Sequence, residues 1–136
     1  MEDVKINVKF KLAALWIVLM FLYIYADFLS LYRPGQLSEI LLGRLGPFEV
    51  TQKSLLAASI VVIIPAIMVF LSLIMKPRVN RRVNIILGII FILINISNLV
   101  GESWVYYFLF GILEIVTALL IIWYAWKWPN REERVG

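Results

Sequence analysis

A single carboxylate stands inside the most apolar stretch of the chain. Glu114 lies in the middle of residues 103–126, SWVYYFLFGILEIVTALLIIWYAW, where it is the only charged residue. An ionised carboxyl is costly in hydrocarbon, so ionisable residues inside membrane segments are rare, and they are candidates for function. Burial favours the neutral, hydrogen-donating form, and a group that alternates between neutral and charged forms can carry a proton or pair with a cation. Glu114 is therefore the first candidate functional residue.

Three further polar residues lie at depths that match in pairs. Counted from the basic residue at the inner end of each stretch, Asn95 lies at the depth of Glu114, and Asp27 shares a level nearer the outside with Asn98. Asn95 is the expected partner of Glu114, and Asp27 with Asn98 would form the outer end of an ion or proton path. The alternative is that these side chains only hold helices together, at about 1 kcal/mol each. Both interpretations stay open for Glu114 and Asn95, whereas the structural one is favoured for Asp27.

Four stretches are long and apolar enough to position these residues as membrane-crossing helices. Hydrophobic residues make up 62% of the 136 residues and charged residues 16%, against about 45–50% and 25% in soluble domains. Crossing the hydrocarbon core takes about 20 apolar residues, which must be helical because lipid offers no hydrogen-bond partner to the backbone. The prediction is an all-α integral membrane protein with a single domain over residues 1–136, an antiparallel bundle of four transmembrane helices. The approximate spans are 12–32, 54–75, 83–101 and 103–126.

The basic residues predict the orientation of this bundle. Cytoplasmic loops of membrane proteins are enriched in Lys and Arg. If both termini are inside, the inner segments contain ten basic residues and the outer segments contain three. Both termini are therefore expected to be cytoplasmic, in a multi-pass protein of the cell membrane. The inner residues are Lys5, Lys9, Lys11, Lys76, Arg78, Arg81, Arg82, Lys127, Arg131 and Arg134, and the outer ones are Arg33, Arg44 and Lys53.

Small and polar residues recur at helical spacing in each span, which predicts one inward face per helix. Small residues on such faces allow close helix packing, and Pro65 is expected to kink the second span. The predicted inward faces are Ala13, Trp16, Met20, Tyr23 and Asp27; Ala58, Val61, Pro65, Met68 and Ser72; Asn84, Gly88, Phe91, Asn95, Asn98 and Glu102; and Gly111, Glu114, Thr117 and Ala118.

Two connections have features of their own. KPRVNRR (76–82) is predicted to be a tight basic turn. Its cations Lys76, Arg78, Arg81 and Arg82 could contact anionic lipid headgroups, although a topology signal alone is the favoured interpretation. In the first outer loop, QLSEILLGRLGP places leucines at helical spacing, which predicts a short interfacial helix that is either a lid or a passive connector.

The composition narrows the function classes. Cys and His are absent, which removes disulfides, the usual zinc and haem ligands, and the commonest general base near neutral pH. No metal, cofactor or enzymatic activity is expected. The net charge of +4 is concentrated at the ends of apolar runs, which does not favour nucleic acid as a partner. The expected partner is the lipid bilayer, and such a small bundle is compatible with a homo-oligomer.

Several stretches resemble a family of small four-span prokaryotic membrane proteins of unknown function. They are VKFKLAALW, YIYADF, LYRPG, FLSLIMKPRVNRRVNII and EIVTALLIIWYAWKWP. The resemblance implies a four-helix membrane fold and a prokaryotic source, and it brings no activity. Two functions are compatible with the residues. One is a proton- or cation-linked transporter or channel-like bundle that uses Glu114, and the other is a non-transporting structural or accessory membrane protein.

Overall fold

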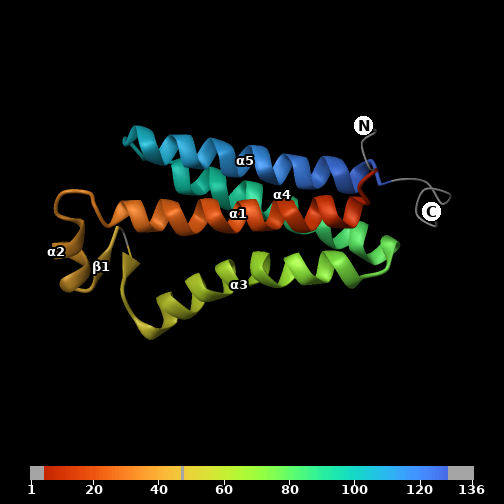
Figure 1. Cartoon of the computed structure of the whole chain (residues 1–136). Helices are drawn as coiled ribbons and strands as arrows, with labels where there is room; N and C mark the ends of the chain where they lie inside the picture. The colour runs from red at the N-terminus through yellow and green to blue at the C-terminus, as the bar shows by residue number, and fades with distance from the viewer. Residues whose placement is uncertain (1–4, 47, 129–136) are drawn as a thin grey trace.

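The computed structural model describes residues 5–46 and 48–128, which form four long helices and a small element after the first of them (Figure 1). We call the end of the bundle that holds this element the outer end, after the predicted orientation, and the opposite end the inner end. The long helices have 22 or 23 residues and a mean hydropathy between 1.9 and 2.8. At about 1.5 Å of rise per residue, each is about 34 Å long, enough to cross a hydrocarbon core of about 30 Å. The four long apolar helices that the sequence predicts are confirmed, although their ends differ from the predicted bounds. In chain order the elements are α1 (Val8–Ser30), α2 (Gln36–Leu41), β1 (Arg44–Leu45), β2 (Phe48–Glu49), α3 (Gln52–Ile74), α4 (Pro77–Leu99) and α5 (Val105–Trp126).

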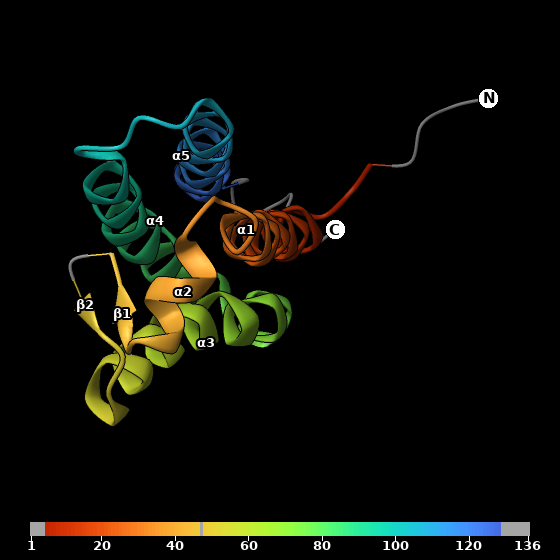
Figure 2. The same cartoon turned by 90° about the vertical axis from the view of Figure 1, so that its left-hand side faces the viewer.

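Successive long helices run antiparallel, so the beginning of α1 and the end of α5 lie at the same end of the bundle (Figure 1). Helix α1 packs against both α3 and α5, and α4 packs along α5. Figure 2 views the bundle from its other end, where the α2 element lies. Helices α3 and α4 are joined by a tight turn and make few contacts beyond it.

The inward faces of α4 and α5 are confirmed over most of their length. On α5, Gly111, Glu114, Thr117 and Ala118 are buried, as are Gly88 and Asn95 on α4. Across the bundle, the rings of Trp16 on α1 and Phe91 on α4 meet edge to face, with their centroids 5.7 Å apart. The predicted faces end before the outer side, because Asp27 and Asn98 are exposed.

Helix α3 is anchored at one end only. Its buried residues, Pro65, Met68 and Ser72, all belong to its C-terminal half. Ala58 is exposed, although it was predicted to face inward, whereas Val61 is half-buried and packs against the core as predicted. Pro65 removes one backbone hydrogen bond from the helix, and α3 changes direction along its length so that its yellow N-terminal part leads away from α1 (Figure 1).

The basic segment is mostly helical, which corrects its prediction as a turn. The connection between α3 and α4 comprises only Met75 and Lys76, and α4 begins at Pro77 instead of at residue 83. Proline is favoured at the first position of a helix because its fixed φ suits the helix and its missing N–H would be unpaired there anyway. Arg78, Arg81 and Arg82 therefore lie on the first two turns of α4.

The outer loop contains the predicted short helix and, in addition, a two-residue hairpin. Residues Arg44 and Leu45 pair antiparallel with Phe48 and Glu49. Gly43 ends α2 with a positive φ of 80°, a conformation that favours glycine, and accepts a hydrogen bond from the Val50 N–H at 2.7 Å. The hairpin depends on glycines with a positive φ, which helical periodicity does not take into account. Pro47, at the predicted end of the helix, lies outside the described residues.

Candidate functional site

Glu114 faces the interior of the bundle, and its neighbours on α5 explain why. Only 6% of its surface is exposed. One turn before it, Gly111 packs so closely on α4 that a Cβ there would lie 2.5 Å from the Leu99 Cδ2. One turn after it, the Thr117 hydroxyl donates to the Leu113 carbonyl at 2.7 Å, so that this polar side chain is satisfied within its own helix. Small residues above and below thus hold the Glu114 side of α5 against the other helices.

The surroundings of Glu114 contain a second acid and two phenols. Its carboxyl interacts electrostatically with Asp27 and Tyr23 on α1 and with Tyr107 on α5. Among the residues that the structure describes, none forms a hydrogen bond with the Glu114 side chain. Buried carboxyls are normally hydrogen-bonded. Glu114 is thus a buried acid that faces another acid and has acceptor positions to spare.

Asn95 is buried on α4, but its hydrogen-bond partner is not the predicted one. Its Oδ1 accepts a hydrogen bond from the Tyr23 hydroxyl at 2.6 Å, and its Nδ2 is buried with no partner within the described part of the chain. The expected hydrogen bond between Asn95 and Glu114 is therefore absent. The Tyr23 hydroxyl, which reaches across from α1, pairs with the amide oxygen, and the Asn95 Nδ2 makes no bond to the Glu114 carboxyl. Tyr23 contacts Asn95 directly and Glu114 electrostatically, so the three belong to one group. We call Tyr23, Asp27, Asn95 and Glu114 the midplane site.

The outer pair of the predicted path is not brought together. Asp27 and Asn98 are both exposed, and no hydrogen bond joins them. Of these two residues, Asp27 interacts electrostatically with Glu114. In residues 5–46 and 48–128, no group of three or more acids forms a potential metal site. The midplane site thus contains two carboxyl groups, those of Asp27 and Glu114, which interact electrostatically.

The outer loops are joined by contacts that were not predicted, which we call the outer clasp: Arg33, Glu102, Trp104, Tyr106 and Tyr107. The Arg33 Nη2 lies 3.0 Å from the Glu102 Oε1, and its Nε donates to the Tyr106 hydroxyl at 2.6 Å. The guanidinium lies 5.1–5.4 Å from the centroids of the three aromatic rings. The opposite charges in LYRPG and VGESW are compatible with this ion pair, but the sequence alone does not show that two distant loops lie side by side.

The two charges of the outer clasp stabilise each other. Burial by itself raises the pKa of Glu102, but hydrogen bonds from the Trp104 and Ser103 N–H groups and from Arg33 outweigh it, and the pKa of Glu102 is lowered. Burial likewise opposes the charge of Arg33, but its bonds to Tyr106 and Glu102 prevail and raise its pKa. Tyr107 interacts with these two charges and also with Glu114 and Asp27, so the outer clasp lies directly next to the midplane site.

A second buried polar group lies at the other end of the bundle. Asn84 accepts a hydrogen bond from the Trp16 Nε1 at 2.7 Å and donates to the Asn80 carbonyl and Oδ1 at 2.9 and 2.6 Å. Asn80 donates in turn to the Ser72 carbonyl at 2.7 Å. We call Trp16, Ser72, Asn80 and Asn84 the inner network; all four are fully buried and join α1, α3 and α4. Asn80 was missed because its segment was predicted to be a turn, although its spacing of one helical turn from Asn84 was visible.

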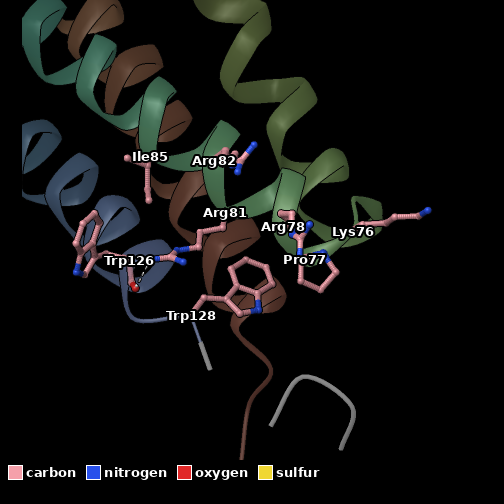
Figure 3. A pocket seen from close by; sticks show the side chains of 8 residues that line it. All are labelled: Lys76, Pro77, Arg78, Arg81, Arg82, Ile85, Trp126 and Trp128. Carbon is pink, nitrogen blue, oxygen red and sulfur yellow. Dashed lines mark hydrogen bonds between the residues drawn. The ribbon is translucent and has the colours of Figure 1, made fainter. Parts of the chain in front are cut away.

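The four cations of the basic segment gather around one pocket at the same end (Figure 3). The pocket has a volume of about 690 Å³ and opens beside the C-terminal end of α5. Its lining residues are Lys76, Pro77, Arg78, Arg81, Arg82, Ile85, Trp126 and Trp128.

Four long apolar helices with polar groups between them define a small multi-span α-helical membrane protein. The chain matches a family of unknown function, DUF6326, over residues 3–134, and it belongs to that family. No curated protein and no solved structure matches the chain. The resemblance seen in the sequence is thereby confirmed, and the family brings no activity with it.

Proposed function

We propose that this protein is a small proton- or cation-linked membrane transporter or channel-like bundle with both termini in the cytoplasm, in which Glu114 binds the transported proton or cation. The observation that supports this most is the state of the Glu114 carboxyl. It is buried, it interacts with a second acid, and it forms no hydrogen bond with a described residue. A carboxyl that served only to join helices would be hydrogen-bonded across an interface.

The other residues of the midplane site fit a binding role. Two negative carboxylates repel each other in a medium of low dielectric constant, and either a proton on Glu114 or a monovalent cation between the two acids removes that repulsion. The free Nδ2 of Asn95 is a donor that can orient the Glu114 carboxyl when the proton or cation leaves. Asp27 lies in the last turn of α1 and is exposed, so it is the proposed point of exchange with the outer solution.

The test is a flux measurement on the full chain reconstituted in liposomes. With a pH-sensitive dye inside, and with imposed proton, Na⁺ or K⁺ gradients, the wild-type protein should give a flux above that of empty liposomes. Glu114→Gln keeps the shape of the side chain and removes its charge, and it should abolish the flux. Glu49→Gln alters an exposed acid of β2 and is the matched control. Equal flux with Glu114→Gln and with Glu49→Gln would rule the proposal out.

A second candidate is a non-transporting accessory membrane protein, supported by the inner network and the outer clasp. Both groups consist of bonds between helices or loops, whose effect is to fix the bundle. For this candidate, liposomes should show no flux above background with any gradient, and Glu114→Gln should lower thermal stability or dissociate an oligomer. Neither candidate involves catalysis, and both place the chain in a lipid bilayer, alone or with further copies of itself.

A further inference from the structure

The pocket at the inner end combines positive charge with an apolar wall. Arg78, Arg81 and Arg82 lie on the first two turns of α4, and Lys76 precedes them. No acid is among the pocket's lining residues in the described part of the chain. Pro77, Ile85 and the two tryptophans form the remaining wall (Figure 3). Positive side chains that line one pocket without an acid between them favour an anion there.

The beginning of α4 adds hydrogen-bond donors to this charge. The residue at its N-cap is Lys76, whose side chain forms no capping hydrogen bond. The first N–H groups of a helix have no partner within the helix, and they are well suited to bind an anion together with the positive end of the helix dipole. Helix α4 has 23 residues, and its first turn forms one side of the pocket.

Trp128 provides an independent indication that an acceptor belongs here. The indole is 9% exposed and lines the pocket, and its Nε1 is buried with no hydrogen-bond partner among the described residues. An indole N–H can only donate, and a buried donor without an acceptor costs about 1–3 kcal/mol. In Figure 3 the Trp128 ring lies between the end of α5 and the Pro77 turn. In Figure 3 its nitrogen lies on the ring edge that is turned away from the arginines, so a phosphate oxygen would become its acceptor once the indole rotates toward them.

Arg81 is held in place at the wall of the pocket. Its Nη2 donates to the Trp126 carbonyl at 3.3 Å, and its guanidinium lies 5.6 Å from the centroid of the Trp126 ring. This arrangement satisfies an otherwise free carbonyl near the end of α5 and fixes the arginine before any ligand binds, which lowers the entropy cost of binding. Figure 3 shows this bond and the Arg78 and Lys76 side chains on the other side of the pocket.

We propose that this pocket binds the phosphate group of an anionic phospholipid in the leaflet at the inner end of the bundle. The site would place the phosphate between the arginines and the free amides of α4, with the Trp128 N–H as a further donor. The apolar wall and Trp126, which is 63% exposed, offer contact to the glycerol and the first carbons of the acyl chains. These apolar contacts favour a lipid over free phosphate. The proposal does not depend on whether the protein transports anything.

The test compares lipid retention by the full chain. The protein is delipidated in detergent and mixed with phosphatidylglycerol or phosphatidylcholine, and bound lipid is counted by native mass spectrometry. Phosphatidylglycerol should be retained and phosphatidylcholine should not. At about a fivefold loss for each cation near a lipid headgroup, Arg78→Gln with Arg82→Gln should weaken binding about twenty-fivefold. Trp128→Phe keeps the ring, removes the N–H, and should weaken binding about tenfold.

The control variant removes two cations from the opposite end of the bundle. Arg44→Gln with Lys53→Gln should leave phosphatidylglycerol binding unchanged, because neither residue lines the pocket. Equal lipid retention by the pocket variants, the control and the wild type would overturn the proposal. Inorganic phosphate is the second arm, and if it displaces the lipid at millimolar concentration the site is one for free phosphate and the assignment to lipid is wrong. Thermal stability of each variant separates loss of binding from loss of folding.

Discussion

The inner network and the midplane site both place an asparagine of α4 opposite an aromatic side chain of α1. In the inner network, Asn84 uses its oxygen and its nitrogen, and Trp16 is fully paired. In the midplane site, Asn95 uses its oxygen for Tyr23, but its nitrogen has no partner among the described residues. A saturated network resists change, because breaking it leaves buried groups without partners. The Glu114 carboxyl of the midplane site forms no hydrogen bond with a described residue, so it can take up a proton or a cation without first losing a bond.

The largest expected effect on stability comes from a substitution in the inner network, whose hydrogen bonds are all formed. Asn84→Leu leaves the Trp16 N–H buried without an acceptor and should lower the free energy of unfolding by about 2 kcal/mol. Unfolding in mixed micelles with increasing denaturing detergent measures this change. Asn98→Leu makes the same replacement at an exposed position of α4 and should stay within about 0.5 kcal/mol of wild type. If both variants unfold alike, the inner network does not stabilise the bundle.

Glu114→Gln tests the midplane site in the same comparison. No hydrogen bond with a described residue is lost, and repulsion from Asp27 is removed, so stability should be unchanged or higher by up to about 1 kcal/mol. The same unfolding assay measures it, while flux is lost. A loss of stability as large as that of Asn84→Leu would instead show that Glu114 has a structural role.

Tyr23→Phe tests the bond that connects α1 to the midplane site. The hydroxyl is lost and the ring stays, so the Asn95 oxygen loses its donor and stability should fall by about 1 kcal/mol. Tyr25→Phe, at an exposed tyrosine of the same helix, is the control. The unfolding assay measures the change in the free energy of unfolding. The dependence of flux on pH should shift for Tyr23→Phe and stay unchanged for Tyr25→Phe. An unchanged pH profile would separate Tyr23 from the binding group.

The smallest expected effect concerns pH and the outer clasp. Because the pKa of Glu102 is lowered below its ordinary value of 4.5, its contribution to stability is fully present above that value. It is lost as the pH falls further, towards the pKa of the folded state. The change should be about 1 kcal/mol, since the pair is only partly buried and solvent still screens its charges. Thermal unfolding between pH 6 and pH 3 should show this loss in wild type and not in Glu102→Gln, with Glu39→Gln as a control at the exposed Glu39–Arg44 pair.

Local patterns predicted the spans and most inward faces, but they did not predict which side chains meet. Hydropathy identifies a crossing segment, and spacings such as Gly111, Glu114 and Ala118 identify a face, because both depend on one helix at a time. The bond between Tyr23 and Asn95 depends on how α1 and α4 are rotated against each other, which no single segment specifies. The role of Asn80 was not predicted for a local reason. The many charged residues in its segment suggested a turn, although Pro77 favours the start of a helix there.

The one-sided anchoring of α3 has a mechanical consequence. A beam that is clamped at one end and free at the other bends most at its free end. Here the clamp consists of Pro65, Met68 and Ser72 and the turn to α4. The opposite half contains no fully buried residue, and only Val61 of that half packs against the core, so displacing its first turns separates little packed surface. Helices α4 and α5 are in contact along their length, so the bundle is compliant on the α3 side and rigid on the side that holds Glu114.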